Sequence, residues 1–181
     1  MVSRHGRAGK PGLPRRVALR MLVALAALTE VADAARAEPP LLAVFDFSLV
    51  DTSPSPPGAA EIARIKALGD TLRTALAASG RYRIADPARL RAALDPSAGI
   101  LHCNGCERSA AQALGAPLAC YGWVQKVSEL ILNINLVIED AATGAVVRAG
   151  SVDIRGNTDE SWQRGLRFLL DDRILGDPGE H

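Results

Sequence analysis

Residues 130–138 of this 181-residue chain, LILNINLVI, place apolar side chains at every even position and two asparagines among the odd ones, which is typical of a β-strand with one buried face. A turn sequence, DAATG, follows at residues 140–144, and residues 145–154 are predicted to return as an antiparallel strand. Residues 118–127 are predicted to form the strand before this pair. The C-terminal half should therefore contain an antiparallel β-meander, with one face buried by Leu130, Leu132, Ile134, Leu136 and Ile138.

The remaining pattern predicts two more strands and four helices. The strands are at residues 41–47, broken by one acid, and 82–85; the helices are at 59–79, 87–94, 107–114 and from 157 onward. In the last helix Asn157 is predicted to be the cap, with Glu160 reaching back as in a capping box. The order β-α-β-α-α-β-β-β-α indicates a single α/β (α+β) domain, with helices packed on a mixed sheet of about five strands.

The first 37 residues are predicted to be a signal peptide. Residues 1–20 contain six basic side chains and no acid, residues 21–28 are apolar, and Ala35-Arg36-Ala37 has the small-x-small pattern of a cleavage site. Eight apolar residues are too few for a membrane-spanning helix, which needs about 20. The alternative is an amphipathic N-terminal helix of the folded domain. The signal interpretation predicts a soluble periplasmic or secreted protein, residues 38–181, with no membrane insertion after cleavage.

The formal net charge of +1 conceals two unlike segments. Residues 1–37 have a net charge of +5, whereas residues 38–181 have 14 basic and 18 acidic side chains and a net charge of −4. A mildly acidic domain is poorly suited to bind nucleic-acid phosphates or anionic lipid surfaces. We therefore expect no nucleic-acid partner.

Cys103 and Cys106 form a C-x-x-C pair, with Gly105 easing a tight turn. In an oxidising compartment these cysteines are predicted to form a structural disulfide; a redox-active pair is the alternative. Cys120, in a predicted strand, is expected to be a buried free thiol, although it could instead bridge to one of the pair. A zinc site using these cysteines with His102 is disfavoured, because no second paired motif exists. We expect no metal.

Catalytic signatures are absent from the sequence. His102 is the only histidine available for an ordered triad, and there is no G-x-S-x-G, P-loop or G-x-G-x-x-G motif. The acidic pairs Asp46/Asp51 and Asp159/Glu160 are interpreted as strand-end solvation and helix capping. Gln125 and Lys126, like Asn133 and Asn135, are interpreted as a solvated sheet face or, alternatively, a polar binding surface. An enzyme is therefore not the favoured reading, and no cofactor is expected.

Several motifs together resemble a proteobacterial family of small exported proteins that is classed only as a domain of unknown function. They are AVFDF (43–47) with DTS (51–53), the C-x-x-C pair, VQKVS (124–128) through NIN (133–135), DAATG (140–144) and GNTDESW (156–162). A weaker resemblance is to the N-terminal α/β domain of TolB and to CsgG-type periplasmic proteins. It rests on V-x-D-F in the first strand, Leu114-Gly115-Ala116, Gly122 and the D-x-x-T-G turn. It implies a non-catalytic interaction domain of the cell envelope.

These observations lead to two functional hypotheses. The first is a non-catalytic periplasmic binding or accessory module that recognises another envelope protein or a small ligand. The residues expected to form or support its surface are Asp46, Asp51, Gln125, Lys126, Asn157, Asp159 and Trp162. The alternative is a periplasmic thiol-redox protein in which Cys103 and Cys106 are the working pair.

Overall fold

The computed structural model describes residues 38–54, 56–95 and 99–176. The chain divides into two units, Met1–Glu38 and Pro39–His181, and the fold below is that of the second. The predicted signal peptide, residues 1–37, lies outside the described residues.

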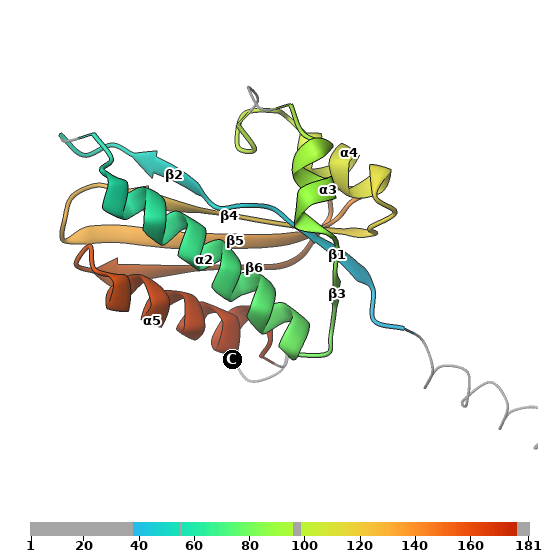
Figure 1. The fold of residues 1–181 in the computed structure, drawn as a ribbon. Helices are drawn as coiled ribbons and strands as arrows, with labels where there is room; N and C mark the ends of the chain where they lie inside the picture. The colour runs from blue at the N-terminus through green and yellow to red at the C-terminus, as the bar shows by residue number, and fades with distance from the viewer. Residues whose placement is uncertain (1–37, 55, 96–98, 177–181) are drawn as a thin grey trace, which may run out of the picture. The chain divides into compact units, whose positions relative to one another are not determined.

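A six-stranded mixed sheet forms the centre of the domain (Figure 1). Its strands are β1 Leu41–Val44, β2 Ser48–Asp51, β3 Arg83–Ile84, β4 Leu118–Lys126, β5 Ile131–Asp140 and β6 Val146–Arg155. The order is β3-β1-β4-β5-β6, and β1 and β2 both pair in parallel with β4, β1 along its first half and β2 along its second. The antiparallel meander β4-β5-β6 confirms the prediction for the C-terminal half.

The sixth strand arises because the strand predicted at residues 41–47 is interrupted. Phe45 packs in the core on one face of the sheet and Phe47 in the core on the other, while Asp46 between them is exposed. Gly122 makes this arrangement possible, since a Cβ there would lie 2.5 Å from the Phe47 ring. The chain then pairs with β4 again as β2, so that the predicted five strands become six.

The helices match the predicted positions. They are α2 Ala59–Ala78, α3 Pro87–Ala92, α4 Cys106–Ala113 and α5 Asp159–Leu169, which continues as the π-helical turn η1 Leu170–Ile174. The predicted cap of α5 is wrong: Thr158, not Asn157, caps the helix by accepting a hydrogen bond from the Ser161 backbone N–H. Asn157 is unavailable as a cap because its side chain is bonded elsewhere. Glu160 pairs with Arg164 instead of reaching back.

Two hydrophobic cores flank the sheet. On one face, α2 and α5 pack their Leu and Trp side chains against the even-numbered residues of β5. On the other, α3 and α4 form a smaller, alanine-rich core near β1. Helix α5 approaches the sheet closely at Gly165, where a Cβ would lie 2.5 Å from Ile154 Cγ2.

The predicted buried face of β5 is confirmed from Leu132 to Ile138, all of whose even-numbered side chains are at most 1% exposed. Leu130 is the exception. It is 70% exposed, because the strand begins at Ile131 and Leu130 lies in the preceding turn. Within the described parts of the chain, no helix is long and apolar enough to cross a membrane.

Candidate functional site

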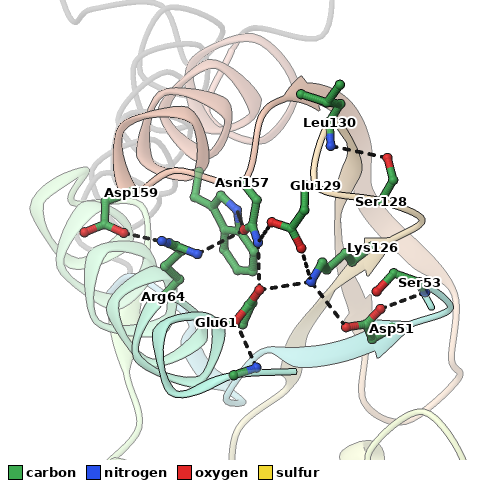
Figure 2. Close-up of polar contacts among 12 residues, drawn as sticks. Asp51, Ser53, Glu61, Arg64, Lys126, Ser128, Glu129, Leu130, Asn157 and Asp159 are labelled. Atoms are coloured by element: carbon green, nitrogen blue, oxygen red, sulfur yellow. Dashed lines mark hydrogen bonds and ion pairs between the residues drawn. The ribbon is translucent and has the colours of Figure 1, made fainter. Parts of the chain in front are cut away.

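Lys126, the last residue of β4, lies on the inner face of the sheet and is only 1% exposed. Its ammonium Nζ contacts three carboxylates, at 2.7 Å to Glu129 Oε1, 3.0 Å to Glu61 Oε1 and 3.6 Å to Asp51 Oδ2 (Figure 2). Together with Asn157 these residues form what we call the Lys126 cluster. The cluster connects β2, the first turn of α2, the β4–β5 turn and the segment before α5.

Local structure explains why the three carboxylates meet. Asp51 is the register partner of Lys126 in the parallel β2–β4 pair. Glu61 occupies the third position of α2, where its Oε2 accepts a hydrogen bond from the Gly58 backbone N–H at 3.0 Å and leaves Oε1 for Lys126. Glu129 lies three residues after Lys126, in a turn closed by the bond from Val127 N–H to the Ile131 carbonyl.

Asn157 connects the cluster to the helical layer. Its Nδ2 donates to Glu61 Oε1 at 2.7 Å and to Glu129 Oε2 at 2.9 Å. Its Oδ1 accepts from Arg64 at 3.1 Å and from the Trp162 indole N–H at 3.0 Å. All the hydrogen-bonding atoms of this amide are therefore used, which fixes the position of Trp162 in the core.

Hydrogen bonds keep the four ionisable groups of the cluster in their charged forms. The hydrogen bond from Lys126 lowers the pKa of Glu61 to about 2 and also lowers the pKa of Glu129. The hydrogen bond from Ser53 is the largest effect that lowers the pKa of Asp51. Hydrogen bonds to Glu129 and Glu61 raise the pKa of Lys126 above its ordinary value. None of these four groups titrates near neutral pH, so the cluster is suited to hold loops together and unsuited to general acid–base chemistry.

Of the seven residues predicted to form or support a surface, the structure brings five together. Asp51, Lys126 and Asn157 belong to the Lys126 cluster, Trp162 is buried beneath it, and Asp159 is linked to it through Arg64 at 2.6 Å. Gln125 is exposed on the other face of β4. Asp46 lies apart, in the segment between β1 and β2, and pairs with Arg73 at 2.9 Å and with Arg91 at 3.8 Å.

Sequence reasoning missed Glu61, Arg64 and Glu129. Glu61 carried a recognisable signal, because a Glu three residues after a capping position commonly bonds back to the chain. Glu129 is three residues from Lys126, but in a turn this spacing does not by itself indicate an ion pair. Nothing in the sequence near Arg64 indicated its bonds to Asn157 and Asp159, which are more than 90 residues away.

The β4–β5 turn above the cluster presents large apolar side chains to solvent. Leu130 is 70% exposed, Ile131 52% and Val127 46%. The same turn carries the Glu129 side chain, which is 65% exposed although one of its oxygens contacts Lys126. An apolar turn with an acidic edge is thus anchored to the core by buried polar bonds.

The expected pairing of the cysteines is present in the structure, whereas a structural rather than a redox role for the disulfide stays a prediction. Cys103 and Cys106 form a disulfide with Cα atoms 5.5 Å apart, and Cys120 is free and buried in β4. Burial raises the pKa of the Cys120 thiol, which makes it a poor nucleophile. Cys103, Cys106 and Glu107 lie close enough together to hold a metal ion, but sulfurs joined in a disulfide are not thiolate ligands.

A family model, DUF3280, described as "Protein of unknown function (DUF2380)", matches residues 40–174. The chain belongs to this family. The predicted resemblance to an uncharacterised family is thereby confirmed. None of the curated proteins is significantly similar to the chain.

Three solved structures are similar to the chain, and the first of them shows that another protein shares the fold. The LpoB C-terminal domain from Salmonella enterica is 19% identical, with a TM-score of 0.51 over 65% of this chain and 84% of that one. Lipoprotein GNA1162 from Neisseria meningitidis is 15% identical, with a TM-score of 0.48 over 67% and 84%. TolB from Acinetobacter baumannii is 15% identical, with a TM-score of 0.39 over 74% of this chain and 28% of that one. At 19% identity the likeness to the LpoB domain concerns the fold alone.

Proposed function

We propose that residues 38–181 form an exported, non-catalytic module that binds another protein through the β4–β5 turn. The observation that carries this proposal is the exposure of Val127, Leu130 and Ile131 on a turn that the Lys126 cluster holds in place. Exposed large apolar residues gathered at one place are typical of interaction sites. A turn that is already ordered also loses little conformational entropy on binding, which favours affinity.

The charges around the turn suggest what kind of partner would fit. Glu129 on the turn and Asp159 at the start of α5 have side chains 65% and 86% exposed, and residues 38–181 have a net charge of −4. A complementary surface would contain an apolar pocket for Leu130 with basic residues around it. The partner we propose is therefore an envelope protein with a basic-rimmed apolar pocket.

Export is the part of the proposal that depends on residues 1–37. Expression of the full chain, followed by fractionation and intact-mass measurement, tests it. The expected product is a periplasmic or secreted protein that begins at Glu38. A protein that keeps residues 1–37 and remains in the cytoplasm would contradict the proposal.

The binding surface is tested by substitution. The exported chain is first tagged and cross-linked in envelope extract to identify a partner. The purified partner is then titrated with the Leu130→Asp variant and with the control variant Val146→Asp. Val146 is 62% exposed at the start of β6, at the opposite end of the β5–β6 hairpin, so it matches Leu130 in exposure and chemistry. We expect Leu130→Asp to weaken binding about ten-fold or more and Val146→Asp to leave it unchanged. Equal effects of the two substitutions would exclude the turn as the contact surface.

A further inference from the structure

A pocket lies away from the Lys126 cluster, between the start of α4, the outer face of β4 and the β5–β6 turn. Its volume is about 500 Å³, within the usual range for small-molecule sites. The residues that matter to the argument are Glu107, Arg108, Tyr121, Trp123 and Glu139. The Cys103–Cys106 disulfide borders the pocket, since Asn104 and Gly105 within the disulfide loop line it.

Glu139 is the unusual member of this site. Glu139 is only 6% exposed, and its Oε1 has no hydrogen-bond partner among the residues the structure describes. Glu139 belongs to the outer face of β5, where it is the register partner of Ala119 in β4, and α4 packs on that face, so Glu139 is buried as well as the inward-facing Ile138. A buried carboxylate oxygen without a donor is costly, which points to a missing partner.

The surrounding charges define what that partner must supply. Burial raises the pKa of Glu139, and Glu107, a residue 9% exposed, raises it further through its charge and through hydrogen bonding between the two carboxyl groups. Arg108 is the cation facing this pair, but its Nε is 3.7 Å from Glu107 Oε1, beyond hydrogen-bond distance. The site therefore has two crowded carboxyl groups and lacks a close N–H donor for Glu139 Oε1.

Two aromatic rings complete the wall. Tyr121 and Trp123 are two residues apart on β4 and lie on the same face, with ring centroids 6.4 Å apart and planes inclined by 19°. Aromatic faces attract cations and also pack against apolar groups. Carboxylates beside aromatic rings are a combination that suits an organic cation.

We propose that this pocket binds a ligand with a primary or secondary ammonium group on an apolar or aromatic body. The ammonium N–H donates to Glu139 Oε1 and relieves the repulsion between Glu139 and Glu107, while the body packs against Trp123 and Tyr121. This inference is independent of the proposed protein-binding turn, because the two sites share no residue.

The experiment uses the exported chain and three probes at neutral pH. Phenethylamine has an ammonium group and a ring; its N,N,N-trimethyl analogue keeps the charge but has no N–H; 2-phenylethanol has no charge. The chain contains two tryptophans, so the indole N–H resonances report separately on Trp123 in the pocket and on Trp162, which is buried against Asn157. We expect phenethylamine to shift the Trp123 resonance saturably and to leave the Trp162 resonance unchanged. The dissociation constant from this titration should be about ten-fold lower for phenethylamine than for either analogue.

Two variants sharpen the result. Glu139→Gln should weaken phenethylamine binding about ten-fold, whereas Asp153→Asn, an exposed acid on the outer face of β6, should not change it. Without any probe, Glu139→Gln should also raise the melting temperature at neutral pH, because it removes a repelled buried charge. Equal binding of all three probes, no saturable shift at millimolar concentration, or a lowered melting temperature for Glu139→Gln would overturn the proposal.

Discussion

Replacing Lys126 by methionine tests whether the Lys126 cluster holds the loops of this end of the domain together. Methionine is about as long as lysine and suits a position that is 1% exposed, so the substitution removes the charge with little change in packing. It leaves the Asp51 and Glu61 carboxylates, whose side chains are 6% and 10% exposed, without their shared cation.

The magnitude follows from these burials. Removing one partner of a buried ion pair typically costs about 3–5 kcal/mol, because the other charge stays buried and unpaired. Two features reduce the cost here. Glu61 keeps its hydrogen bonds from Gly58 and Asn157, and Glu129 is largely exposed to water. We therefore expect Lys126→Met to lower the free energy of unfolding by about 3 kcal/mol at neutral pH.

Equilibrium denaturation in urea, followed by tryptophan fluorescence, measures the loss. The matched control is Lys66→Met, because the Lys66 side chain is 78% exposed and pairs with Asp70 on the surface of α2; it should cost less than about 0.5 kcal/mol. The double variant Lys126→Met/Glu61→Gln should recover about 1 kcal/mol or more, since it removes one of the stranded charges. If Lys126→Met costs no more than Lys66→Met, the cluster does not stabilise the domain and the reasoning fails.

Three further predictions concern other contacts. The pKa of Glu61 is about 2 in the folded domain against an ordinary value of 4.5, so the stabilisation from its ionised form is complete above pH 4.5 and is lost as the pH falls toward 2. Melting temperatures measured across this pH range should show the loss, and Glu61→Gln should flatten the pH dependence. Gly165→Ala should destabilise the domain by about 1–3 kcal/mol in thermal unfolding, because the new methyl group would overlap Ile154, whereas the exposed neighbour Arg164→Ala should have little effect. Thiol trapping across glutathione buffers should find the Cys103–Cys106 disulfide oxidised throughout, because a carboxylate 3.6 Å from the Cys103 sulfur disfavours its thiolate; ready reduction would support the redox alternative instead.

Local patterns were sufficient to predict most of the fold. A few adjacent residues suffice to predict the alternation in β5, the turn at residues 140–144 and the end of α2 before Gly80. Each of these features is present in the structure. Gly80 takes a φ of +67°, which a residue with a side chain rarely adopts. What failed was the strand predicted at residues 41–47, because its interruption depends on the space that Gly122 leaves for Phe47, a contact between residues distant in sequence.

The candidate site shows the same division between local and distant information. The interpretation of Lys126 as part of a solvated sheet face is wrong, because Lys126 has the same parity along β4 as Val124 and Cys120, both fully buried, and therefore lies on the inner face of the sheet. A lysine at an inward position needs acidic partners, since an unpaired buried charge would be too costly. The sequence could not say which acids they are. Asp51 reaches Lys126 only because the strand is interrupted after β1 and pairs with β4 again as β2. Glu61 reaches Lys126 only because α2 begins shortly after β2. The cluster is therefore a consequence of the interrupted strand, and a substitution that restored a continuous strand would separate Asp51 from Lys126.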